Sequence, residues 1–180
     1  PVPKMIQEAL IKNVDKGAYA AVPGIPELRN AISKYNKHYF GIDVSPDRIY
    51  VGPGTKELIF NLLEILHGTV ILPTPAWLGY LPQIRFLKKN YHMLSTRANG
   101  KIAPKDLKKL ALRLQDRQKI LILNNPHNPS GLLYTKSELE EITDVCRELN
   151  ISVISDEIYA QTTYDFSKFV SMGKIYPEGT

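Results

Sequence analysis

The aliphatic run at 119–125 constrains the fold more than any other feature of the sequence. In "KILILNN" the apolar residues follow one another without the alternation of a half-exposed strand. Such runs are typical of strands buried on both faces, as in parallel sheets. The run ends in the polar loop "NNPHNPSG" at 124–131, where Asn125 and Asn128 each precede a proline. Proline lacks a backbone donor and favours extended geometry in the residue before it, so we predict a stiff loop that aims a side chain.

Predicted strands and helices alternate along the chain. Short apolar runs predict strands at 48–52, 69–75, 91–95, 119–125 and 151–159. Apolar residues at helical spacing predict helices at 3–14, 26–40, 54–66, 76–89, 104–114 and 135–150, with a kink at Pro82. The helix at 135–150 opens with the capping-box pair Thr135 and Glu138. This order predicts an α/β fold with a mostly parallel sheet.

Composition narrows the class of protein. A chain of 180 residues with 43% hydrophobic residues can form one domain with a sizeable core. The net charge of +5 comes from scattered Lys and Arg, which favours solvated helix faces over a nucleic-acid-binding patch. The single cysteine, Cys146, lies in an apolar-periodic segment and is predicted to be a core residue, which excludes a disulfide framework.

No signal peptide opens the sequence, and no segment has the apolar length of a membrane span. We therefore expect no membrane partner, no nucleic acid partner and a cytoplasmic, reducing location. The sequence starts with "PVPKMIQEAL" and stops in "IYPEGT", and neither resembles a natural terminus. We expect the chain to be a piece of a longer protein.

Polar residues follow four of the predicted strands, and in parallel sheets ligands bind beyond the carboxyl ends of the strands. The segment "GPGTKE" at 52–57 joins a strand to a helix. Backbone N–H groups at a helix N-terminus attract anions, Gly54 allows close approach, Thr55 can donate and Lys56 adds charge. The alternative is an ordinary glycine turn with a threonine cap. The spacing is neither that of a Walker loop nor that of the dinucleotide fingerprint.

Two other strand ends carry candidate ligand contacts. Trp77, the only tryptophan, follows the strand at 69–75 and is either a core residue or a stacking platform for a flat ligand. Asp156 and Glu157 follow the last buried strand, where a carboxylate needs a cationic partner unless it caps a helix. Tyr159 lies three residues after Asp156 and can bring a phenol to the same ligand. A phosphate seat, an aromatic ring, an amide, a carboxylate and a phenol together suit pyridoxal phosphate.

The sequence resembles the class I/II aminotransferases, pyridoxal-phosphate enzymes of the aspartate-aminotransferase-type fold. The resemblance rests on "GAYAAVPGIPELRNAI", "GPGTKELIF", "PTPAWLGY", "NNPHNPSG" and "SDEIYAQTTYD", which span nearly the whole chain. The pairing of "NPHNPSG" with "DEIY" about one helix later is the most specific signal. The resemblance implies a three-layer α/β/α cofactor domain of the pyridoxal-phosphate-dependent transferase type, incomplete in this chain.

The resemblance also implies roles for the site residues. Asn128 resembles the amide donor to the ring hydroxyl of the cofactor, and Tyr159 the phenol that meets the same oxygen. Asp156 resembles the carboxylate that pairs with the pyridine nitrogen and keeps it protonated, in agreement with the effect of an opposite charge at short range. Trp77 resembles the ring that stacks on the pyridine face.

Further resemblances concern the phosphate. Thr55 and Lys56, with the amides around Gly54, match the phosphate-binding turn, although many relatives have a smaller polar residue in place of Lys56. Tyr19 resembles the tyrosine that reaches the phosphate of the neighbouring subunit, which implies a homodimer.

The resemblance implies that essential parts lie outside the chain. The lysine that forms the Schiff base, two arginines for phosphate and substrate, and the small domain are expected elsewhere. Residues 1–180 are thus expected to be the front part of the cofactor domain and to be inactive alone, because no lysine starts the covalent cycle. Lys168 is predicted not to replace it, because it follows Asp156 too closely and its neighbours Asp165, Phe166 and Ser167 indicate a surface turn.

Three functions remain open at this stage. The parent protein is expected to be an aminotransferase that moves an amino group between α-amino and α-keto acids. A lyase or synthase of the same fold would share these motifs, because they position the cofactor and not the reaction. A non-catalytic remnant that binds cofactor or dimerises is the third alternative.

Overall fold

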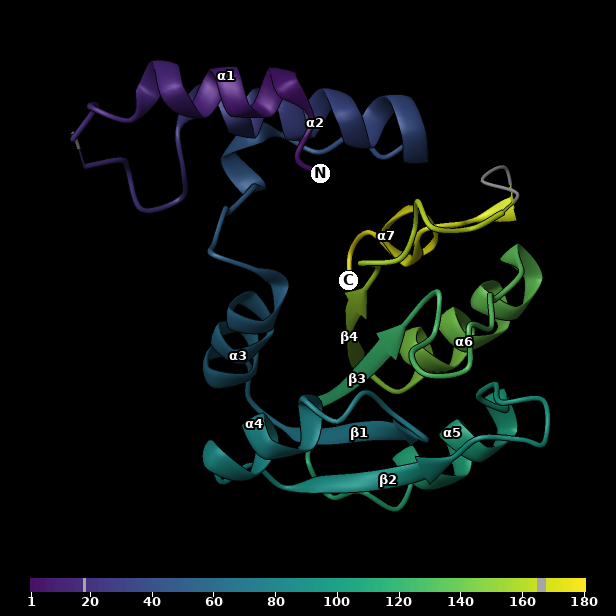
Figure 1. The fold of residues 1–180 in the computed structure, drawn as a ribbon. Helices are drawn as coiled ribbons and strands as arrows, with labels where there is room; N and C mark the ends of the chain where they lie inside the picture. Colours follow the sequence, from purple (N-terminus) through teal and green to yellow (C-terminus); the bar gives the residue numbers. More distant parts are fainter. Residues whose placement is uncertain (18, 165–167) are drawn as a thin grey trace.

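A computed structural model gives the structure of the chain and describes residues 1–17, 19–164 and 168–180 (Figure 1). Its centre is a parallel sheet of four strands in the order β2-β1-β3-β4. The strands are β1 (Thr69–Thr74), β2 (Tyr91–Ser95), β3 (Lys119–Asn124) and β4 (Ile151–Asp156). All six residues of β3 are buried, as the aliphatic run predicts. The predicted α/β fold with a parallel sheet is confirmed.

Helices cover both faces of the sheet, so the body of the molecule has three layers. The helices are α1 (Lys4–Asn13), α2 (Pro26–Phe40), α3 (Thr55–Ile65), α4 (Tyr80–Phe86), α5 (Pro104–Ala111), α6 (Lys136–Glu148) and α7 (Met172–Ile175), with a 3-10 turn, η1 (Pro46–Arg48). Leu121 and Leu123 of β3 pack into one core with α5, α6 and α7. Ile120 and Ile122 pack into the other core with α3 and α4.

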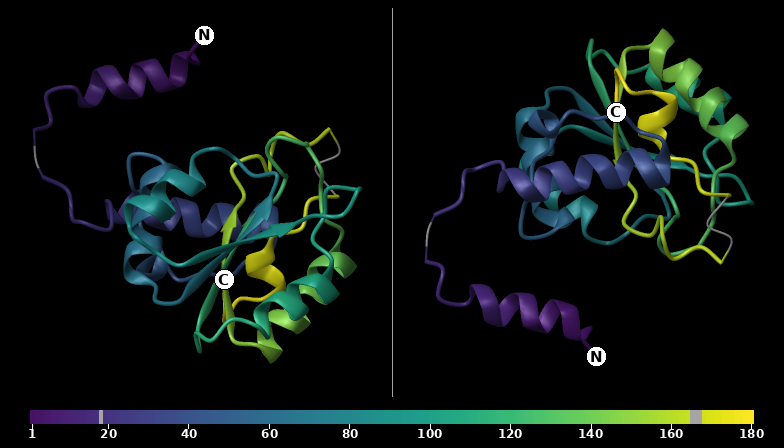
Figure 2. Two further views of the ribbon diagram at one scale, coloured as in Figure 1. Left: turned by 90° about the horizontal axis from the view of Figure 1, so that it is seen from below. Right: turned by 90° about the horizontal axis from the view of Figure 1, so that it is seen from above.

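The first helix stands apart from these layers. Figure 2 shows α1 projecting away from the sheet and its covering helices. None of its residues is buried, and its apolar side chains Met5, Leu10 and Ile11 are at least 70% exposed. Within the described part of the chain, α1 therefore contributes nothing to either core.

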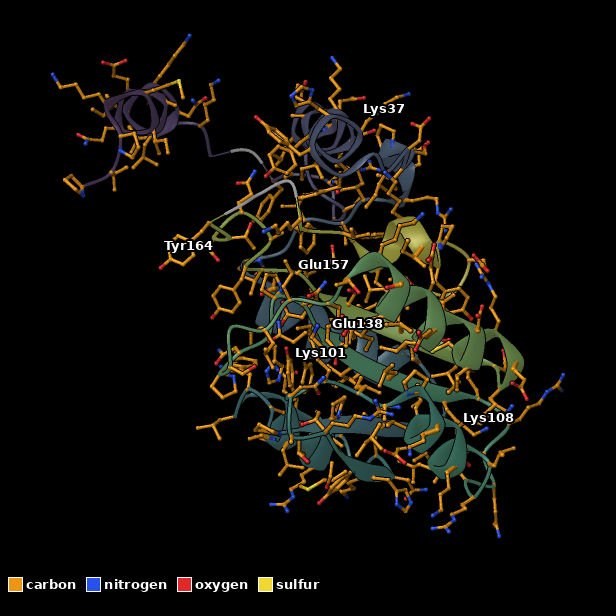
Figure 3. All side chains as sticks on the ribbon, turned by 90° about the vertical axis from the view of Figure 1, so that its right-hand side faces the viewer. Lys37, Lys101, Lys108, Glu138, Glu157 and Tyr164 are labelled. Carbon is orange, nitrogen blue, oxygen red and sulfur yellow. The ribbon has the colours of Figure 1, made fainter. Side chains whose placement is uncertain are left out.

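Local sequence signals explain where several helices begin. The Thr135 hydroxyl accepts a hydrogen bond from the backbone N–H of Glu138, and the Glu138 carboxylate accepts one from the backbone N–H of Thr135, so the predicted capping box starts α6. Lys101 adds an ion pair to Glu138 at 2.6 Å, and the two side chains face each other in Figure 3. Cys146 of α6 is fully buried, and burial raises the pKa of its thiol to about 12, as suits a core residue.

Three predicted elements differ in the structure. Residues 48–52 form no strand among the described residues, because Val51 finds only one backbone partner, the carbonyl of Pro23. The helix predicted at 76–89 begins only at Tyr80, so Pro82 lies in its first turn, where a missing N–H costs nothing, and it causes no kink. The last strand stops at Asp156 instead of 159.

The helices of the described residues include none with the length and apolar character of a membrane span.

Candidate functional site

Six of the eight predicted site residues line one pocket at the carboxyl end of the sheet. Parallel pairing places Asn124, the last residue of β3, directly beside Asp156, the last residue of β4. The pocket beyond them has a volume of about 180 Å³. Its lining consists of Thr55, Lys56, Trp77, Tyr80, Asn124, Asn128, Asp156, Ile158 and Tyr159. Gly54 and Tyr19 are the two predicted residues that the lining does not include.

The first turn of α3 forms one end of the pocket. Gly54 precedes the helix with a φ of 135°, a conformation that residues with a side chain rarely adopt. Its carbonyl accepts hydrogen bonds from the amides of Glu57 and Leu58. Within the described residues, the amides of Thr55 and Lys56 have no protein acceptor, and the ammonium of Lys56 has no ion-pair partner. These donors suit an anion such as a phosphate.

Trp77 forms a side wall of the pocket and also contacts the core. It is half-buried and packs against the core beneath α3 and α4. Its ring meets the ring of Tyr80 edge to face, with centroids 5.2 Å apart and planes at 82°. Trp77 thus packs against the core and also lines the pocket, while its stacking on a ligand stays a prediction.

Asp156 receives hydrogen bonds on both carboxylate oxygens. The Tyr80 hydroxyl donates to Oδ2 at 2.6 Å, and the backbone N–H of Ile158 donates to Oδ1 at 3.3 Å. Burial, followed by the hydrogen bond to Asp156, raises the pKa of the Tyr80 phenol, which therefore remains a donor at neutral pH. A carboxylate held in this way keeps its remaining lone pairs for a cationic or N–H group in the pocket.

The proline-rich loop after β3 brings Asn128 into the lining of the pocket that Asp156 also lines. The amide Nδ2 of Asn128 donates to the Tyr159 hydroxyl at 3.3 Å. The peptide bonds Asn125–Pro126 and Asn128–Pro129 are cis. His127 ties this loop to the segment after β1, because its ring nitrogens lie 2.6 Å from Ser130 Oγ and 3.0 Å from the Pro75 carbonyl. The loop thus fixes the direction of the Asn128 amide.

Sequence reasoning missed three residues that line the pocket: Tyr80, Asn124 and Ile158. Asn124 is the last residue of a buried strand, and that position alone is a signal for a ligand contact. Tyr80 follows Trp77 by three residues and lies at the start of a helix, so its inward direction was readable only from the structure. Ile158 contributes through the N–H group that donates to Asp156.

The remaining predicted residues lie outside this pocket. Tyr19 is fully exposed in the segment between α1 and α2 and contacts no pocket residue within the described chain. Lys168 is exposed and lines a neighbouring pocket of about 570 Å³, which shares Asn128 and Tyr159 with the first. The surface turn predicted for Asp165, Phe166 and Ser167 lies outside the described residues.

Comparison with known proteins establishes the family. The family model for aminotransferase class I and II matches residues 1–177. The chain belongs to the class I and II aminotransferases. Within this family it is 32% identical over 180 residues to the aspartate aminotransferase of Bacillus subtilis strain 168, covering 96% of this chain and 45% of the relative. It is 35% identical over 183 residues to a probable aspartate/prephenate aminotransferase of Aquifex aeolicus strain VF5, covering 94% and 44%.

Solved aminotransferase structures share the fold. The aspartate aminotransferase from Thermus thermophilus with maleate superimposes with a TM-score of 0.90 at 31% identity, over 99% of this chain and 47% of that chain. The alanine aminotransferase from Pyrococcus furiosus superimposes with a TM-score of 0.86 at 31% identity, over 96% and 45%. This aminotransferase chain thus spans about half the length of the relatives that it matches.

Proposed function

We propose that the full-length protein containing this chain is a pyridoxal-phosphate-dependent aminotransferase. It moves an amino group between an α-amino acid and an α-keto acid. The observation that carries the proposal is the convergence of Lys56, Trp77, Asn128, Asp156 and Tyr159 on one pocket. Membership of the class I and II family supports the same activity.

The donors and acceptors of the pocket fit each part of pyridoxal phosphate. The free amides of Thr55 and Lys56, with the Lys56 ammonium, would hold the phosphate. Trp77 offers a ring to stack on the pyridine. Asn128 and Tyr159, already in contact with each other, would meet the ring hydroxyl. When bound, the cofactor supplies an electron sink for bond changes at the amino-acid α-carbon.

The chain's own residues prepare the site for this chemistry. Asp156 would hold the proton at the pyridine nitrogen, because its carboxylate is fixed by Tyr80 and by the Ile158 amide. Asn128 is oriented by the proline-rich loop and so fixes the tilt of a bound ring. Each residue acts by orientation and charge, which are most effective when the groups are placed before the ligand arrives.

The rest of the proposal concerns the parts of the protein beyond this chain. We infer that residues 1–180 are the front part of the cofactor domain, and that the Schiff-base lysine, the arginines and the small domain lie in the remaining half. The chain's span of about half of its relatives supports this division. The exposed Tyr19 and the exposed apolar face of α1 are compatible with a homodimer in which Tyr19 reaches the partner's phosphate site. A cytoplasmic location stays a prediction.

An assay of the purified full-length protein tests the proposal. The protein is incubated with pyridoxal phosphate and a panel of amino acids, with and without an α-keto acid acceptor, and products are measured by mass spectrometry. Amino-group transfer that requires the keto acid is the expected result. Product formation without the acceptor would favour a lyase or synthase. A protein that binds pyridoxal phosphate but converts no amino acid would favour the non-catalytic remnant.

A further inference from the structure

The Asn124 side chain links the two strand ends that carry the predicted ring contacts. Its Nδ2 donates to the backbone carbonyl of Asp156 at 2.9 Å, and its Oδ1 accepts from the backbone N–H of Asn128 at 2.6 Å. Asn124 is only 6% exposed and lies at the base of the pocket. One planar amide therefore connects the backbone of Asp156 to the backbone of Asn128.

We propose that Asn124 is a positioning residue that sets the spacing between Asp156 and Asn128. The inference rests on the proposed function, in which Asp156 meets the nitrogen of the pyridine ring and Asn128 meets its hydroxyl. A rigid aromatic ring demands a fixed separation between the group at its nitrogen and the group at its hydroxyl. The amide of Asn124 supplies that fixed separation, because both of its polar ends are engaged at hydrogen-bond distance.

Among the described residues, no other single side chain hydrogen-bonds to the backbone of both Asp156 and Asn128. Strand pairing aligns Asn124 with Asp156, and the Asn125 backbone N–H still bonds to the Asp156 carbonyl, but Asn128 lies three residues further along in the loop. The direct side-chain contact of Asn128 is with Tyr159, which is 38% exposed and so less firmly held. Losing the Asn124 amide would leave the Asn128 N–H without its acceptor and free the loop to shift relative to β4.

Asn125 provides a matched control in the neighbouring position. It is also a buried asparagine with two side-chain hydrogen bonds, from Nδ2 to the Val170 carbonyl at 3.3 Å and from the Tyr134 amide to Oδ1 at 3.1 Å. These partners do not line the pocket. The Asn125 backbone N–H donates to the Asp156 carbonyl at 3.0 Å, and this bond survives a side-chain substitution.

The test compares Asn124→Ala and Asn125→Ala in the full-length protein. Urea unfolding measures stability, and titration of the cofactor-free protein measures affinity for pyridoxal phosphate and, separately, for inorganic phosphate. Both variants are expected to lose similar stability. Only Asn124→Ala is expected to bind pyridoxal phosphate about tenfold more weakly, the loss that one to two hydrogen bonds represent. Inorganic phosphate affinity should stay unchanged in both, because the anion seat lies at α3.

The proposal would be overturned if Asn124→Ala and Asn125→Ala lost the same affinity for pyridoxal phosphate. It would also be overturned if Asn124→Ala lost as much affinity for inorganic phosphate as for pyridoxal phosphate. If Asn124→Ala does not fold, Asn124→Asp keeps the acceptor for Asn128 and removes the donor to Asp156. Wild-type cofactor affinity in that variant would also overturn the proposal. If the wild-type protein binds no pyridoxal phosphate, the proposed function and this inference are both overturned. If it binds pyridoxal phosphate and substitution of Asn124 leaves that affinity unchanged, the inference alone is overturned.

Discussion

At the scale of single residues, Asp156 is the group on which the proposed chemistry depends most. Its two oxygens accept from the Tyr80 hydroxyl and the Ile158 amide, so its position is fixed before any ligand binds. A negative charge held beside a pyridine nitrogen favours the protonated ring. Substitution of Asp156 therefore tests the electrostatic part of the proposal.

Asp156→Ala in the full-length protein is expected to lose most activity while remaining folded. The variant leaves the protonated ring nitrogen without its partner, and a loss of about 3–4 kcal/mol of transition-state stabilisation is expected, as for removal of one preorganised electrostatic group. Steady-state kinetics measures the loss, and circular dichroism checks folding. Turnover close to that of the wild type would remove Asp156 from the mechanism.

Trp77→Ala is expected to weaken cofactor retention and to change the absorbance of the bound cofactor. The indole ring lines the pocket while part of it packs on the core, so the variant should lose stability as well as binding. Fluorescence titration measures cofactor affinity, and thermal melting measures stability. If the melting temperature falls and the affinity stays constant, Trp77 serves as a core residue only.

At the scale of elements, Glu157 joins the end of β4 to the start of α7. Its Oε1 accepts from Ser155 Oγ at 2.7 Å and from the Met172 amide at 2.8 Å. Burial raises the pKa of this carboxyl above its usual value of 4.5, against the lowering effect of its hydrogen bonds, and the charge of Asp156 raises it further. Glu157 therefore connects the end of β4, which carries Asp156, to the start of α7.

The raised pKa predicts how Glu157 affects stability. The Glu157 carboxyl binds its proton more tightly in the folded state than in the unfolded state. Its contribution to the free energy of unfolding is therefore fully present below pH 4.5 and is lost as the pH rises through the pKa of the folded state. Glu157→Gln keeps an oxygen acceptor for Ser155 and Met172 and cannot ionise. The free energy of unfolding of the wild type, relative to Glu157→Gln, is therefore expected to fall as the pH rises above 4.5. Urea unfolding at several pH values measures the difference, and a constant or rising difference would contradict the assignment.

The sequence predicted elements best where local signals and burial agree. The aliphatic run of β3 and the capping box of α6 each determine a boundary to within a residue or two. The segment at 48–52 has the composition of a strand, but strand formation requires a neighbour, and composition cannot provide one. Tyr80 was missed for a similar reason, because its contact with Asp156 joins residues 76 positions apart. Motifs in strand-end loops located most of the pocket, while side-chain contacts between distant elements needed the structure.

At the scale of the whole molecule, the chain contains the pocket proposed for the cofactor ring and phosphate, and the lysine expected to bond to the cofactor is predicted to lie outside residues 1–180. Lys168 is the lysine that follows "SDEIY" most closely, and it lines the neighbouring pocket instead of the one around Asp156. The covalent partner of the cofactor is therefore expected in the remaining half of the protein.

Borohydride reduction followed by peptide mapping tests this account most directly. The full-length protein is saturated with pyridoxal phosphate, reduced and digested, and the labelled peptide is identified by mass spectrometry, with the 180-residue chain treated in parallel. The account predicts one stoichiometric label on a lysine outside residues 1–180 and no stoichiometric label on the isolated chain. Stoichiometric label on Lys168 in either sample would contradict it.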